Sequence, residues 1–128
     1  MKDTNLVKVL VIDDSSTNNL LFQSILEDEG YQVLSASDGK DGLITAEKYH
    51  PDLILLDIMM PKMDGIDVLK NLSENVYLKD IPVLIISAKN DAATIKKAKQ
   101  MGALDYIIKP VSILDVMERI HSCLRGKK

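Results

Sequence analysis

The stretch Pro51-Asp52-Leu53-Ile54-Leu55-Leu56-Asp57-Ile58-Met59-Met60-Pro61-Lys62-Met63-Asp64-Gly65 decides the fold class of this chain. The apolar run inside it is too short for a typical helix, and a Pro-x-x-Asp-Gly turn follows it. It predicts a strand buried on both faces, as in parallel sheets. The strand ends at Asp57, which places a carboxylate at the sheet edge where open parallel sheets bind ligands.

Four other apolar runs predict strands of the same kind, at residues 8–12, 31–36, 81–86 and 104–108. Amphipathic patterns predict five helices, at residues 15–29, 38–49, 64–74, 91–101 and 112–125. Strands that alternate with helices indicate an α/β fold, a doubly wound parallel sheet of five strands with five helices on its two faces. We expect residues 1–128 to form a single domain with a core from about residue 7 to about residue 125.

Local signals set the ends and faces of the helices. Candidates for helix starts are Ser15, Asp38, Asp64 and a capping box of Ser112 with Asp115, and two stops are Gly30 and Gly102. The apolar spacing directs a set of side chains toward the core, among them Leu21, Ile25, Leu26, Leu43, Ala46, Tyr49, Leu114, Met117 and Ile120. On the last helix, Ile113, Val116 and Cys123 extend the apolar surface beyond the core-facing side.

Composition limits the classes of function. At 128 residues and 46% apolar content, the chain is long enough for one core. A formal net charge of −3 gives no global reason to expect nucleic-acid binding. One cysteine, Cys123, excludes an internal disulfide framework, and no signal peptide or membrane-spanning run is evident. We therefore expect a cytoplasmic protein that binds neither nucleic acid nor membrane.

Polar residues end four of the predicted strands: Asp13, Asp14, Asp57, Ser87 and Lys109. Because the carboxyl ends of parallel strands meet at one edge of the sheet, these side chains should converge there. Taken alone, each has a simpler explanation, such as a helix-capping acid or a solvated strand end. The whole set in order favours a functional site.

The charges at this edge favour a divalent cation. Two like charges about 4 Å apart repel by about 1 kcal/mol in water and by about 4 kcal/mol at an effective dielectric constant of about 20. Three carboxylates against one lysine therefore call for a hard cation, and Mg²⁺ is usually held by one or two carboxylates, waters and a substrate phosphate. Lys109 and Ser87 could then bind a transferring phosphoryl group, with Asp57 as the nucleophile.

The chain resembles the receiver domains of bacterial two-component response regulators, from Lys8 to about Leu124. The resemblance rests on Val-Leu-Val-Ile-Asp13-Asp14, Leu-Leu-Asp57-Ile-Met-Met-Pro61-x-Met-Asp-Gly65, Ile-Ser87-Ala88 and Asp-Tyr106-Ile-Ile-Lys109-Pro110, each at a predicted strand end. It implies a flavodoxin-like three-layer sandwich with strand order 2-1-3-4-5. That order places the first and third strands side by side, which brings the three aspartates together.

The resemblance also implies the chemistry. Asp57 would accept a phosphoryl group from a sensor histidine kinase, a phosphotransfer protein or a small donor such as acetyl phosphate. Asp14, Asp57 and the backbone carbonyl of Met59 would ligate Mg²⁺, and Asp13 would act through a bound water. Lys109 would pair with the phosphoryl oxygens. The domain would thus catalyse its own phosphorylation and dephosphorylation and is not a metabolic enzyme.

Further positions take family roles by the same resemblance. Ser87, where threonine is more frequent, would bind the phosphoryl group, and Tyr106 would swing inward as Ser87 moves. The Lys109–Pro110 bond would be cis. Met59 and Lys89 occupy positions that tune hydrolysis of the phosphoryl group, and an apolar Met59 predicts a lifetime of minutes or longer.

Output is expected on the face built from the helix at residues 91–101, the strand at 104–108 and the last helix. In this family that face binds a partner or a second copy of the chain, so a homodimer is one expectation. The sequence does not name the kinase. It fits both a stand-alone receiver and a receiver from a longer regulator.

Three alternatives stay open at this point. A flavin-binding flavodoxin shares the architecture, but the loop after the first strand begins with two acids in place of a phosphate-binding loop. A metal-dependent phosphatase with an aspartyl-phosphate intermediate normally has Asp-x-Asp there, whereas this chain has Asp13-Asp14-Ser15. The third alternative is an interaction module of receiver fold that works without phosphorylation.

Overall fold

The computed structural model describes residues 7–124, and its strands and helices alternate along the chain. The strands form one parallel sheet in the order β2-β1-β3-β4-β5. Their bounds are β1 (Lys8–Ile12), β2 (Gln32–Ala36), β3 (Leu53–Leu56), β4 (Val83–Ser87) and β5 (Asp105–Ile108). The predicted doubly wound α/β class and the strand order are both confirmed.

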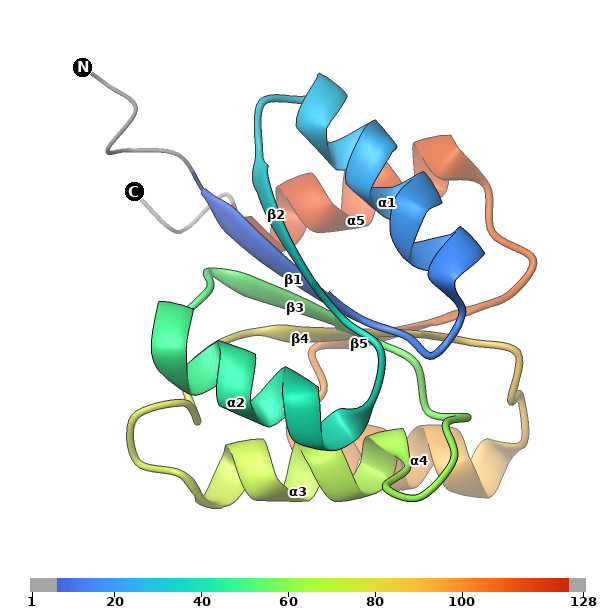
Figure 1. The fold of residues 1–128 in the computed structure, drawn as a ribbon. Coiled ribbons are helices and arrows are strands. Elements are labelled where there is room, and N and C mark those ends of the chain that lie inside the picture. The colour runs from blue at the N-terminus through green and yellow to red at the C-terminus, as the bar shows by residue number, and fades with distance from the viewer. Residues whose placement is uncertain (1–6, 125–128) are drawn as a thin grey trace.

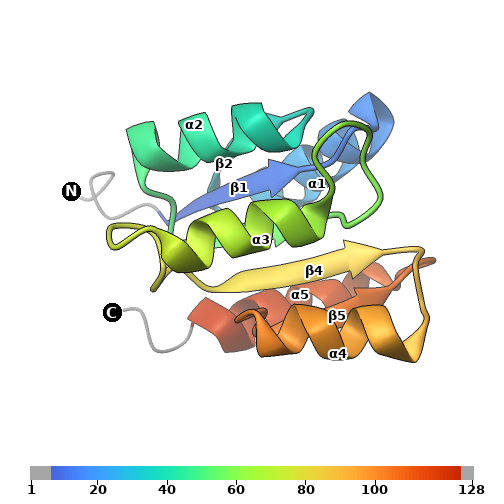
Figure 2. The same cartoon turned by 90° about the horizontal axis from the view of Figure 1, so that it is seen from below.

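Helices cover both faces of the sheet. They are α1 (Ser16–Asp28), α2 (Gly39–Tyr49), α3 (Gly65–Glu74), α4 (Ala92–Gln100) and α5 (Ile113–Leu124). Figures 1 and 2 show α1 and α5 on one face and α2, α3 and α4 on the other. The predicted end of the last helix, Arg125, lies outside the described residues. None of the helices within residues 7–124 combines the length and apolarity needed to span a bilayer.

Strand β3 is buried on both faces, as predicted. Its side chains alternate between the two layers, because successive residues of a strand point to opposite faces. Leu53 and Leu55 belong to the core cluster that includes residues of α1 and α5. Ile54 and Leu56 belong to the cluster that includes residues of α2, α3 and α4. A strand without a solvated face needs this continuous apolar run.

The register of the central strands places the acidic residues. Ile12 of β1 pairs with Leu56 of β3, and the Asp57 backbone N–H donates to the Ile12 carbonyl at 3.0 Å. On the other side of β1, the Asp13 N–H donates to the Ala36 carbonyl at 3.2 Å. The backbone of both aspartates is therefore fixed by the sheet itself.

Two glycines are required by close approaches. A Cβ on Gly65 would lie 2.5 Å from the Asp57 carbonyl oxygen, so only glycine lets α3 begin against this backbone. A Cβ on Gly42 would lie 2.5 Å from Cδ1 of Ile12. Gly42 lowers the helix propensity of α2, and the structure shows why a glycine stands there.

The predicted helix ends hold, with one exception. Ser15, Asp38 and Asp64 cap α1, α2 and α3, and their side chains accept the backbone N–H groups of Asn18, Asp41 and Asp67. Gly30 and Gly102 have φ values of 92° and 110°, as helix-ending glycines do. The predicted capping box at Ser112 is half formed: its Oγ accepts the Asp115 N–H at 3.4 Å, but the Asp115 carboxylate pairs with Arg119.

Three predicted core positions are wrong. Leu21 is 48% exposed, Tyr49 is 42% exposed and Leu114 is 80% exposed. On α1, Phe22 occupies the inward position beside Leu21. On α5, Val116 is buried, so it belongs to the core and not to the additional apolar surface. Two residues turn a helix by about 200°, so a buried Val116 directs Leu114 outward. Tyr49 is the last residue of α2.

Candidate functional site

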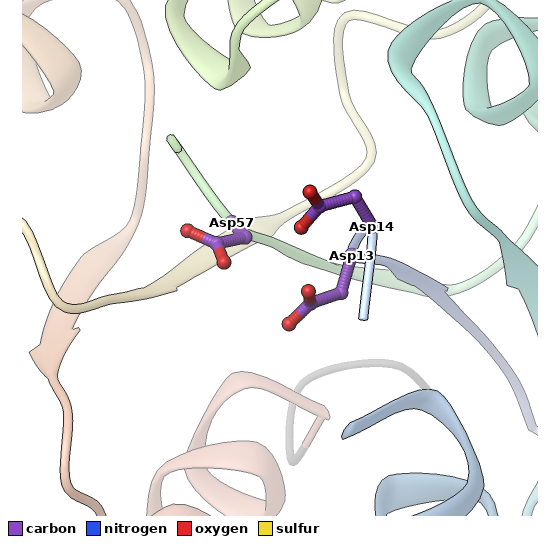
Figure 3. Close-up of side chains that lie close together, drawn as sticks. All are labelled: Asp13, Asp14 and Asp57. Carbon is purple, nitrogen blue, oxygen red and sulfur yellow. The ribbon is translucent and has the colours of Figure 1, made fainter. Parts of the chain in front are cut away.

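Three carboxylates meet at the carboxyl ends of β1 and β3. Asp13 and Asp14 follow β1, and Asp57 follows β3. One carboxylate oxygen from each lies within 4.8 Å of those from the other two, and Figure 3 shows the three side chains together. Asp13 and Asp57 are buried, at 4% and 7% exposed, while Asp14 is exposed. The cluster thus has two buried acids and one acid open to solvent.

Lys109 brings an ammonium group to this cluster from the end of β5. Its Nζ lies 3.2 Å from Oδ2 of Asp13 and 3.1 Å from Oδ2 of Asp57. Burial by itself lowers the pKa of Lys109, but the two carboxylates outweigh burial and raise that pKa above its ordinary value. Because the pKa is raised on folding, these ion pairs stabilise the fold throughout the neutral range. On the alkaline side their contribution is lost as the pH rises from the ordinary lysine pKa of 10.5 through the raised pKa of Lys109.

Asp13 is held by three further donors from its own end of the chain. Its Oδ1 accepts the Ser15 N–H at 2.9 Å, and its Oδ2 accepts from Nδ2 of Asn18 at 3.2 Å. Its backbone carbonyl accepts from Nδ2 of Asn19 at 2.9 Å. The sequence analysis missed both asparagines. A signal existed for Asn19, because it is an amide on the buried side of an amphipathic helix.

Asp57 is held by the loop that follows it. Its Oδ1 accepts the Met59 N–H at 3.0 Å, and its Oδ2 contacts Lys109. The loop closes where the Gly65 N–H donates to the Ile58 carbonyl at 2.9 Å. The Met59 side chain is 56% exposed. The loop therefore orients this carboxylate and leaves the Met59 side chain exposed.

Ser87 and Tyr106 are linked through Lys89. Ser87 ends β4 and is fully buried, and its Oγ accepts the Lys89 N–H at 3.2 Å. The Tyr106 hydroxyl donates to the Lys89 carbonyl at 2.6 Å. Burial raises the pKa of Tyr106, so the phenol stays protonated at neutral pH. The ring already lies inward at 8% exposed, and its coupling to Ser87 stays a prediction.

A hollow of about 630 Å³ lies between the loop after β3 and helix α4. Met59 and Lys89 both line it, so the two predicted rate-tuning positions border the same space. The Lys109–Pro110 peptide bond is cis, as the resemblance implied. The structure joins Lys109 to Asp13 and Asp57 and groups Asp14 with them. Ser87 and Tyr106 are linked to each other through Lys89, and their action on the acidic cluster stays a prediction.

The cluster fits a hard divalent cation. Three carboxylates and one ammonium leave a formal charge of −2 in a region where two of the acids are buried. Like charges this close repel strongly in a partly buried site. The donors are carboxylate oxygens, which Mg²⁺ and Ca²⁺ prefer, and the exposed Asp14 leaves the cluster open to solvent.

Comparison with known proteins identifies the family in which this site occurs. The model of the response regulator receiver domain matches residues 9–121. The chain belongs to this family. That match favours the receiver interpretation over the flavin-binding and phosphatase alternatives. Two-component and chemotaxis response regulators contain this domain, and the aspartate cluster of this receiver domain lies at its sheet edge.

Relatives of two lengths match this receiver domain. It is 42% identical over 118 residues to the alkaline phosphatase synthesis transcriptional regulatory protein PhoP of Bacillus subtilis, over 92% of this chain and 48% of that protein. It is 34% identical to Protein PilH of Pseudomonas aeruginosa, over 94% of this chain and 100% of that protein. The chain spans about half the length of the transcriptional regulators among these relatives.

A solved structure supports the same placement. The CheX-CheY-BeF3-Mg+2 complex from Borrelia burgdorferi matches with a TM-score of 0.86 and 34% identity, over 94% of this chain and 91% of that one. Fold and sequence therefore agree on the receiver family.

Proposed function

We propose that this receiver domain accepts a phosphoryl group on Asp57 and signals through it. The observation that carries the proposal is Lys109, whose ammonium joins the buried Asp13 and Asp57 carboxylates beside the exposed Asp14. This arrangement offers a nucleophile, a cation for phosphoryl oxygens and an open acidic cluster in one place. The related CheX-CheY complex, which contains BeF3 and Mg²⁺, supports the assignment.

The transfer is a displacement at phosphorus. A carboxylate oxygen of Asp57 forms the new bond to phosphorus, while the P–N bond of a phosphohistidine or the P–O bond of acetyl phosphate breaks. The electron pair leaves on the imidazole nitrogen, which takes up a proton, or on the acetate oxygen. Lys109 turns its ammonium toward the phosphoryl oxygens as their charge develops. The donor is a sensor histidine kinase, a phosphotransfer protein or a small phosphodonor.

Mg²⁺ is the cofactor that we infer for the acidic cluster. Asp14, Asp57 and the Met59 backbone carbonyl would hold it, and Asp13 would contact it through a water. When bound, the ion supplies neutralising charge to the transferring group. The chain's own part is to orient the Asp57 oxygen through the Met59 N–H and to keep Lys109 charged.

A test of the acceptor residue uses its chemistry. After reaction with acetyl phosphate, borohydride reduces an aspartyl phosphate to homoserine, and peptide mass mapping locates the change. We expect homoserine at residue 57 only. Modification at residue 13 or 14, or none anywhere, would contradict the proposal.

Replacing Asp14 with asparagine is expected to weaken the response to Mg²⁺ without harming the fold. The substitution removes a repelling charge, and the cluster's hydrogen bonds go to Asp13 and Asp57. In EDTA the variant should melt no lower than wild type. Wild type should gain about 2.7 kcal/mol at a Mg²⁺ concentration of about 100 times its Kd, and the variant much less at that concentration.

Thermal melts with and without Mg²⁺ measure this effect. Asp80→Asn is the matched control, because Asp80 is an exposed aspartate outside the cluster. Equal Mg²⁺ responses in wild type and Asp14→Asn would show that Asp14 is not a ligand.

The phosphoryl group is expected to last for minutes or longer on Asp57. The side chain of Met59, whose N–H binds the Asp57 carboxylate, is apolar and exposed, and a thioether gives an attacking water only a weak hydrogen-bond acceptor. Replacing Met59 with asparagine adds an amide that orients water, so we expect faster loss. Intact mass followed over time after removal of the donor, with Mg²⁺ present, measures the lifetime. Loss from wild type within seconds would refute the prediction.

We propose that the face of α4, β5 and α5 passes the signal to a partner or to a second copy of the chain. Ile108, Ile113 and Leu114 leave apolar surface exposed there, at 42%, 49% and 80%. Phosphorylation would act through Ser87 and Tyr106 to shift this face between two states, and so control a partner or a homodimer. A shift from 1:99 to 99:1 needs about 5.5 kcal/mol of differential stabilisation. If phosphorylation changed neither self-association nor partner binding, the proposed control of this face would be refuted.

We also infer that the domain works in the cytoplasm and binds protein partners, with no direct contact to nucleic acid or membrane. The net charge of −3 and the single cysteine support this assignment. Fractionation of cells that express the chain would test it, and recovery in a membrane fraction would contradict it.

A further inference from the structure

Three groups of this chain donate hydrogen bonds to the Asp13 carboxylate. Both of its oxygens are occupied: Oδ1 by the Ser15 N–H, and Oδ2 by Lys109 and Asn18 together. Lys109 is shared with Asp57, whereas Asn18 donates its side-chain amide to Asp13. The two donors on Oδ2 therefore differ in what else they do.

Asn18 is itself fixed at the start of α1. Its backbone N–H donates to the Oγ of Ser15, the N-cap, at 3.2 Å, and its side chain turns back to Asp13 at 3.2 Å. Asn19, the next residue, ties the Asp13 carbonyl to the same helical turn. The first turn of α1 therefore clamps Asp13 at its carboxylate and at its backbone.

An amide suits this position because it is neutral. A lysine or arginine that donated to Asp13 would cancel part of the negative charge on which a divalent cation depends. An asparagine donates a hydrogen bond and leaves that charge in place. It can therefore orient the carboxylate at no electrostatic cost to metal binding.

We propose that Asn18 is a positioning residue, which holds the Asp13 carboxylate toward the metal both beside Lys109 and after Lys109 turns to the phosphoryl group. This inference rests on the proposed function. In the structure Lys109 and Asn18 share Oδ2 of Asp13. Once the ammonium turns to phosphoryl oxygens, Asn18 is the side-chain donor that remains on this oxygen. Groups that orient metal-binding residues typically contribute about 10- to 100-fold to metal affinity or activity.

The test measures Mg²⁺ affinity directly, by calorimetry or by amide chemical shifts in an NMR titration. We expect Asn18→Ala to weaken Mg²⁺ binding by about 10-fold. Asn18→Leu keeps about the size of the side chain and removes the donor without adding charge, so it separates the hydrogen bond from packing and should weaken Mg²⁺ binding as Asn18→Ala does. Asn71→Ala is the matched control, because the Asn71 amide bonds the Asp67 carbonyl on the exposed side of α3. It removes a side-chain hydrogen bond outside the acidic cluster and should leave Mg²⁺ affinity unchanged.

The outcomes separate the two proposals. Wild type that binds Mg²⁺ and Asn18→Ala that binds it equally well would overturn the positioning role and leave the proposed function intact. Wild type that does not bind Mg²⁺ at all would overturn both. Equal loss of affinity in Asn18→Ala and Asn71→Ala would assign the effect to general stability and would also overturn the positioning role.

Discussion

Replacing Lys109 with methionine is expected to slow phosphorylation by acetyl phosphate about 100-fold, because removing one preorganised donor from a transition state typically costs 10²–10³ in rate. Methionine keeps most of the side-chain length and removes the charge. In the structure the lysine Nζ lies within 3.2 Å of Asp13 and Asp57, so it is the cation placed to meet the phosphoryl oxygens. The same substitution leaves three carboxylates without a compensating charge.

That second consequence gives the prediction an independent readout. Without the ammonium, Mg²⁺ no longer shares the cluster with a competing cation, so we expect tighter Mg²⁺ binding together with slower phosphorylation. In EDTA the variant should also be less stable than wild type. Lys70→Met, on the exposed side of α3, is the control and should change neither property. A Lys109→Met variant that is phosphorylated at the wild-type rate would contradict the assigned role.

Replacing Gly65 with alanine is expected to cost about 1–3 kcal/mol of stability, the usual range for overpacking. The new methyl group would lie 2.5 Å from the Asp57 carbonyl oxygen and 2.6 Å from the Ile58 Cα. Both are backbone atoms at the end of β3, so the start of α3 must move away. The movement would also disturb the loop that orients Asp57, and phosphorylation should slow as well.

Gly42→Ala is the matched comparison. Its methyl group would lie 2.5, 2.9 and 3.1 Å from Cδ1, Cγ1 and Cγ2 of the buried Ile12, which are side-chain atoms and can shift further than the backbone atoms at Gly65. Alanine also raises the helix propensity of α2 by about 1 kcal/mol. Urea unfolding followed by circular dichroism should therefore rank Gly65→Ala as clearly less stable than Gly42→Ala. The reverse order would show that the backbone beside Gly65 shifts at little cost in free energy.

The sequence was sufficient for the sheet and for the strand-end residues. Strand β3 was predictable because a strand buried on both faces has to be apolar throughout. Asp57 is the first polar residue after it. Parallel topology then required Asp13 and Lys109 to converge on the same edge, and their side chains do meet there. The strand order came from the family resemblance.

Helix faces were less predictable. Leu21 and Leu114 are apolar residues on helices, but Phe22 and Val116 face the core and direct them to solvent. Spacing alone permits either choice when apolar residues stand on both sides of a helix. Asn18 was missed for another reason: its importance depends on a side-chain rotamer and on the position of Asp13, which no local pattern shows.

The most direct test of the account is the intact mass of the protein after incubation with acetyl phosphate and Mg²⁺, with Asp57→Ala treated in parallel. We predict a labile gain of one phosphoryl group in wild type, which disappears when EDTA replaces Mg²⁺ and is absent from Asp57→Ala. No gain in wild type, or a gain that persists in Asp57→Ala, would contradict the claim that Asp57 is the phosphoacceptor.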